Sequence, residues 1–97
     1  MLSDNEKRLH SRIEFNQLVR VEPYEGNVLQ LIGVNYSAGG MALNGPRELE
    51  LGEYVDLNFK LNLFGQREFK KTAEVVQNRR LSNMYVTGLR FLGELNI

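Results

Sequence analysis

Hydrophobic and polar residues alternate along much of this 97-residue chain, which is the pattern of strands with one face in a core and one in water. The clearest example is 54–62, where Val, Leu, Phe and Leu alternate with Asp, Asn, Lys and Asn. Similar segments bounded by Gly, Asn or Pro recur, and no long stretch shows the period of about 3.6 residues that marks an amphipathic helix. The pattern predicts six short strands, over 13–21, 28–34, 41–43, 54–62, 67–77 and 84–92.

The predicted strands indicate the fold class. Short strands joined by Gly- and Asn-containing turns are typical of a small antiparallel barrel or sandwich. Closure is favoured because an open sheet leaves two edge strands unpaired. We therefore expect an all-β protein, a six-stranded antiparallel β-barrel over residues 14–97. Residues 1–13 begin with a polar stretch outside the strand pattern, and we expect them to form a flexible N-terminal arm.

Composition narrows the possible functions. Twelve Lys and Arg balance twelve Asp and Glu, and a net charge of zero does not favour general nucleic-acid binding. The absence of Cys and the presence of one His exclude disulfides and thiolate or multi-His metal sites. No stretch approaches the roughly 18 apolar residues of a membrane span, and the start resembles no signal peptide, so we expect a cytoplasmic protein without membrane insertion. No nucleophile–base pair or phosphate loop is visible, so we expect neither an enzyme nor a bound cofactor or metal.

Two short polar motifs carry the candidate chemistry. Arg8 and Arg12 lie four residues apart before the first strand, and a guanidinium group offers paired donors to a phosphate or a guanine edge. The second motif, Asn35-Tyr-Ser37-Ala-Gly-Gly40, follows a hydrophobic strand and combines hydrogen-bonding side chains with a backbone open to close approach. Each motif alone is also compatible with a charged tail or an ordinary Ser-containing turn. Their combination indicates a site for a small, doubly anionic ligand.

The two motifs, Arg-x-x-x-Arg followed by Asn-x-Ser-x-x-Gly, resemble those of the PilZ domain family. The resemblance covers almost the whole chain, and the late segment Tyr-Val-Thr-Gly-Leu-Arg-Phe-Leu over 85–92 is similar to the strand that closes many such domains. It implies a stand-alone, split-barrel β-barrel that binds the bacterial second messenger cyclic di-GMP and has no enzymatic activity. Because the sequence ends six residues after Phe91, we expect little or no C-terminal helix.

The resemblance also implies a ligand-binding set. The two arginines of the first motif would contact the phosphates and a guanine, and the residue just before them stands where a further arginine is frequent. The residues of the second motif would line the barrel surface under the other guanine. In chain order, the implied set is Lys7, Arg8, Arg12, Asn35, Ser37 and Gly40.

The arm suggests a mechanism, and two other functions stay open. Ordering of the arm over a bound ligand would change the surface offered to a downstream protein partner. A small barrel that binds single-stranded nucleic acid is one alternative, although it would need a basic groove with interleaved aromatic residues. The other is a PilZ-like adaptor that no longer binds nucleotide. Of the remaining polar residues, we expect Arg79 and Arg80 to lie in a solvated hairpin tip.

Overall fold

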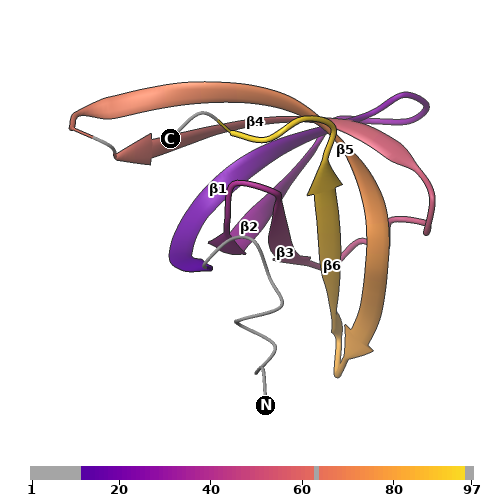
Figure 1. The fold of residues 1–97 in the computed structure, drawn as a ribbon. Coiled ribbons are helices and arrows are strands. Elements are labelled where there is room, and N and C mark those ends of the chain that lie inside the picture. Colours follow the sequence, from indigo (N-terminus) through magenta and orange to yellow (C-terminus); the bar gives the residue numbers. More distant parts are fainter. Residues whose placement is uncertain (1–11, 63, 96–97) are drawn as a thin grey trace, which may run out of the picture.

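Six antiparallel strands close into a barrel in the computed structural model, which describes residues 12–62 and 64–95 (Figure 1). Around the barrel the strands follow the order β1-β2-β3-β6-β5-β4, and β4 pairs with β1 to complete the closure. The strands are β1 Ile13–Pro23, β2 Leu29–Tyr36, β3 Gly40–Gly45, β4 Tyr54–Asn62, β5 Gln66–Leu81 and β6 Met84–Phe91. The predicted fold class is confirmed.

The described residues form no helix or strand outside the barrel. Residues 12–62 and 64–95 contain no helix, so no helix there could cross a membrane. Residues 1–11 of the predicted arm lie outside the described part, and β1 begins directly after Arg12. The division into an arm and a barrel stays a prediction.

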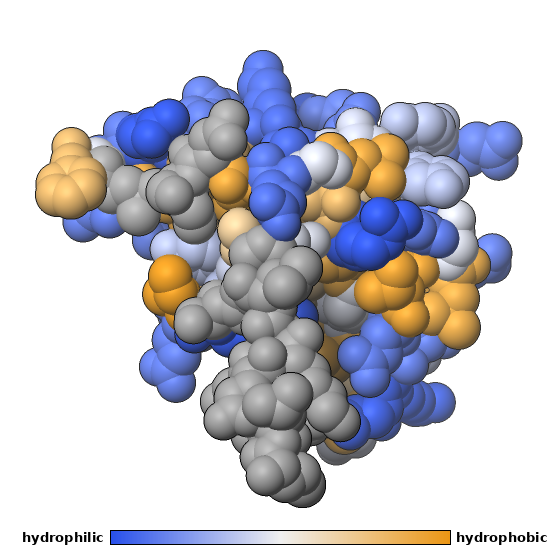
Figure 2. Space-filling view, viewed as in Figure 1, coloured by the Kyte–Doolittle hydropathy of each residue, from blue (hydrophilic) through white to orange (hydrophobic). Residues whose placement is uncertain are grey.

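The barrel interior is filled by the alternate residues that the sequence pattern selected. Val55, Leu57, Phe59 and Leu61 of β4 are all buried, while their neighbours in the strand face outward. Phe59 lies among other aromatic rings and stacks on Phe91 with ring centroids 6.0 Å apart. The face seen in Figure 2 is mostly hydrophilic, with smaller hydrophobic patches between the polar side chains.

Strand β5 is long and strongly bent, and it forms two walls of the barrel (Figure 1). Its first half pairs with β4 and its second half with β6, and the two pairings meet at Ala73 and Glu74. The pairing with β6 continues to the end of β5, and a tight turn follows in which Ser82 has a φ of 57°. The expectation that Arg79 and Arg80 form the hairpin tip is therefore wrong: both lie within β5.

Bulges break the alternation in three strands and change which side chains face outward. In β2 the register shifts between Gly33 and Asn35, so that Asn35 pairs with the outward-facing Ala42. In β5 the shift lies between Val75 and Gln77. Strict alternation would have placed Asn35 and Gln77 on the buried face of their strands. The bulges bring both to the outer wall.

Replacement of the central aromatic side chain tests the core. We expect Phe59→Ala to lower the free energy of unfolding by about 3–5 kcal/mol, because the cavity it leaves cannot collapse fully in a closed barrel. Phe59→Leu should cost only about 1 kcal/mol. Urea denaturation measures both values. The matched control is Phe64→Ala at a fully exposed position, which should change stability by no more than about 0.5 kcal/mol. Equal effects at the two positions would contradict the assignment of Phe59 to the core.

Candidate functional site

A pocket of about 400 Å³ lies on the outer wall of the barrel, over β2, β3, β6 and the second half of β5. It contains residues of both sequence motifs, Arg12 and Asn35. Its lining residues include two arginines and no carboxylate, which suits an anionic ligand. They are Arg12, Asn35, Ala42, Gln77, Arg79, Val86 and Gly88.

Small residues make the floor of this pocket. Ala42 of β3 pairs directly with Gly88 of β6. Asn35 of β2 pairs with Ala42, and Gln77 of β5 pairs with Gly88, so the four residues form one row across four neighbouring strands. A methyl group and a hydrogen atom therefore lie between two longer amide side chains. The barrel wall is hollow here because the centre of the row has almost no side-chain volume.

A hydrogen bond joins the two motifs at one edge of the floor. The Arg12 guanidinium donates from Nη1 to Oδ1 of Asn35 over 2.8 Å, although the residues are 23 positions apart. Both side chains lie at the surface, so the pair remains open to solvent. A guanidinium group has five N–H donors, and the bond to Asn35 uses one of those of Arg12. On the opposite side of the floor, Arg79 adds a second guanidinium group from β5.

Ser37 and Gly40 have a different position from Asn35. The Ser37 side chain is almost fully buried, and its Oγ accepts a hydrogen bond from the Gly39 amide over 3.2 Å. The Ser37 amide donates to the carbonyl oxygen of Gly40 over 2.9 Å. A Cβ on Gly40 would lie 2.3 Å from the backbone oxygen of Leu89, so no side chain fits there. These two residues hold the turn between β2 and β3, and they do not line the pocket.

The structure brings together only part of the implied ligand-binding set. Lys7 and Arg8 lie outside the described residues, so their contacts stay predictions. Gln77 and Arg79 line the pocket but were not expected there. A signal for them is present in the sequence: Val75 and Val76 are consecutive hydrophobic residues, and such a pair marks a break in the alternation of a strand.

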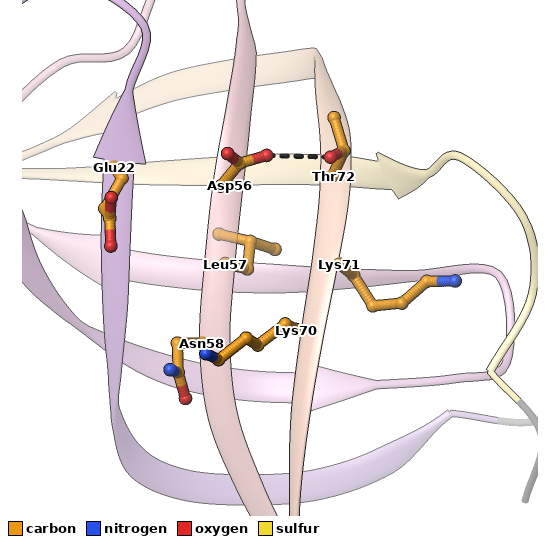
Figure 3. A pocket seen from close by; sticks show the side chains of 7 residues that line it. All are labelled: Glu22, Asp56, Leu57, Asn58, Lys70, Lys71 and Thr72. Carbon is orange, nitrogen blue, oxygen red and sulfur yellow. Dashed lines mark hydrogen bonds between the residues drawn. The ribbon is translucent and has the colours of Figure 1, made fainter.

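A second pocket, of about 320 Å³, lies on another part of the wall, over β1, β4 and β5 (Figure 3). It contains no residue of either motif and combines carboxylates with lysines. The Thr72 hydroxyl donates to a carboxylate oxygen of Asp56 over 2.7 Å. Carboxylates make this pocket less suited to a dianionic ligand. Within residues 12–62 and 64–95, no group of three or more potential metal ligands is clustered.

Comparison with known proteins identifies the family. The model of the PilZ domain matches residues 6–96. The Bacillus subtilis inhibitor of motility, MotI/DgrA, superposes with a TM-score of 0.79 at 21% identity, covering 92% of this chain and 44% of that one. The PilZ domain of YcgR from Escherichia coli, solved with c-di-GMP, gives 0.67 at 19% identity, covering 89% of this chain and 78% of that one. At such low sequence identity, these superpositions show a shared fold and nothing beyond it. Comparison with curated protein sequences gave no match.

Two glycines near the site should respond differently to the same substitution. Gly40→Ala should lower the free energy of unfolding by about 2–3 kcal/mol, because the new methyl group collides with backbone that cannot move freely. Gly88→Ala should cost less than about 1 kcal/mol, because its new Cβ meets the Cβ of Gln77 at 3.2 Å, a contact that a shift of a few tenths of an ångström relieves. Urea denaturation compares them. Equal stability of the Gly40→Ala variant and the wild type would contradict the close packing of the turn.

Proposed function

The chain belongs to the PilZ domain family, and we propose that it is a receptor for cyclic di-GMP. The c-di-GMP in the related YcgR domain supports this ligand. The proposed binding site comprises the arginines of the first motif and the pocket beside Asn35. In this proposal the protein is a cytoplasmic, non-enzymatic regulator that needs no cofactor or metal.

The Arg12–Asn35 hydrogen bond is the observation that best supports the proposal. It holds one guanidinium group at the edge of a pocket whose floor, Ala42 and Gly88, has almost no side-chain volume. Cyclic di-GMP carries two phosphate charges and two planar guanines. A guanidinium fork matches a phosphate or a guanine edge, and its plane can stack on a base. The floor of Ala42 and Gly88 leaves room for a planar base against the wall.

The two halves of the second motif have separate functions in this proposal. Asn35 offers its amide to the ligand and orients Arg12. Ser37 and Gly40 keep the turn in the shape that places Asn35 on the outer wall. Gln77 and Arg79 face the same pocket from β5 and extend the set of polar groups available to the ligand.

Ligand binding is proposed to order the N-terminal arm over the barrel. Charge-assisted hydrogen bonds contribute about 1.5–3 kcal/mol each, whereas ordering costs about 1–2 kcal/mol for each residue fixed. Four or five such bonds with base stacking offset the ordering of a short arm and leave a micromolar affinity, about −8 kcal/mol. The ordered arm then presents a new surface to a partner protein.

Calorimetric titration of cyclic di-GMP tests the receptor proposal. We expect Arg8→Ala and Arg12→Ala each to weaken binding about ten- to hundredfold, because each removes charge-assisted hydrogen bonds. Ser37→Ala should weaken it less, through the loosened turn. The matched control is Arg20→Ala, an exposed arginine of β1 that pairs with Glu22, and it should bind as the wild type does. Absence of binding to the wild type would contradict the proposal.

Hydrogen exchange tests the arm separately. Saturating cyclic di-GMP should slow amide exchange over residues 4–13, because ordered amides exchange less than solvated ones. The β1–β2 turn at 25–28 provides an internal control and should exchange at the same rate with and without ligand. Unchanged exchange over 4–13 together with measurable binding would refute the arm-ordering mechanism and leave the receptor function intact.

A further inference from the structure

The hairpin between β4 and β5 projects from the body of the barrel (Figure 1). An exposed aromatic side chain, Phe64, lies in its turn. Phe64 is fully exposed and has a φ of 51°. Left-handed backbone at a hairpin turn favours Gly, Asn or Asp, and it suits a bulky residue poorly. Neither the turn nor the core therefore explains a phenylalanine at this position, and an explanation must come from something it contacts.

Lys60 and Arg67 flank this tip, and Lys60 pairs across the hairpin with Glu68. Lys70 lies further back, opposite Asn58 at the middle of β4. The segment 60–71 carries four Lys and Arg residues and one Glu. Lys60, Arg67 and Lys70 are exposed, and Figure 3 shows Lys70 and Lys71 pointing to opposite sides of β5. The Arg67 guanidinium lies 5.2 Å from the ring centre of Phe69, which holds its stem along the hairpin. Positive charge is thus present on both sides of the hairpin.

The opposite end of β4 has the opposite charge. The segment 45–56 carries four Asp and Glu residues and one Arg, and it runs into the start of β4 at Tyr54. A strand of nine residues spans roughly 27 Å. The charge therefore differs along β4: the segment that leads into Tyr54 is acidic, whereas the half toward the hairpin carries Lys60, Arg67 and Lys70 against one carboxylate, Glu68. Such a distribution orients a molecule with its basic end toward an anionic surface.

We propose that the tip of the β4–β5 hairpin contacts the surface of an anionic lipid bilayer. Phe64 enters the headgroup layer, and the cations at the base of the hairpin attract the lipid phosphates. A lipid surface fits better than an acidic protein, because a single convex tip offers far less than the roughly 800 Å² that a standard protein interface needs from each partner. A fluid headgroup layer can enclose such a tip. The contact needs no segment that crosses the membrane.

Tryptophan fluorescence tests this contact directly. The chain contains no Trp, so Phe64→Trp introduces a single fluorophore at the tip. Its emission should shift to shorter wavelength with vesicles of phosphatidylcholine containing about one third phosphatidylglycerol, and not with pure phosphatidylcholine. The control is Tyr24→Trp, an exposed position near the acidic end, which should show no shift with either vesicle. No shift for Phe64→Trp would overturn the proposal.

Vesicle sedimentation measures separately what the aromatic ring and what the cationic side chains contribute to membrane binding. Phe64→Ala should lower the partition coefficient about tenfold, and Lys60→Gln and Lys70→Gln about fivefold each. Arg47→Gln, at the acidic end and away from the hairpin, should leave it unchanged. Tighter binding to soluble poly-L-glutamate than to the vesicles, with no effect of Phe64→Ala, would assign the tip to an acidic protein and refute the lipid contact. The vesicles contain no cyclic dinucleotide, so the outcome is independent of the proposed receptor function.

Discussion

The wall that carries the candidate site depends on the register shifts that the closed barrel contains. A strand in a closed barrel has a neighbour on each side, and one extra residue in a strand must leave the ladder as a bulge. In β2 and β5 the extra residue reverses the alternation, so that later side chains of the strand that would have faced the core face outward. Asn35 and Gln77 consequently reach the outer wall, at the two ends of a row whose middle members are Ala42 and Gly88. The pocket is a product of these two bulges and of two small residues between them.

The bulge in β2 explains why the second motif, Asn35 to Gly40, has two physical functions. Ser37 and Gly40 are constrained by the turn, where a buried hydroxyl satisfies a backbone amide and a missing side chain admits the backbone oxygen of Leu89. Asn35 lies just before the turn, on the exposed side of the bulge, and can bond to Arg12. A motif of this kind therefore specifies the position of its first residue through the packing of its last ones. In the proposed receptor, its recognition chemistry and its folding chemistry belong to different residues.

The sequence predicted the parts of the structure that follow from regular alternation. The six strands, and inward-facing residues such as Leu57 and Phe59, follow from a period of two, which local patterning makes visible. The positions of Gln77 and Arg79 could not be predicted in this way, because a bulge shifts the period by one and the expected turn ended β5 too early. Ser37 and Gly40 were recognised as motif residues, but their role in the turn depends on packing against β6, which lies some 50 residues away. Contacts between segments that lie far apart in the sequence cannot be predicted from the local alternation of residues.

Strand β5 connects the two surfaces that the proposals use. Its second half contributes Gln77 and Arg79 to the pocket, and its first half forms one side of the β4–β5 hairpin. The strand bends where these two pairings meet, so the pocket lies over β2, β3 and β6 while the hairpin extends β4. A molecule whose hairpin rests on an anionic surface therefore keeps the pocket on the other half of β5 from the contact. Recognition of a dinucleotide and contact with a lipid surface then require no competition for the same residues, although one bent strand carries both.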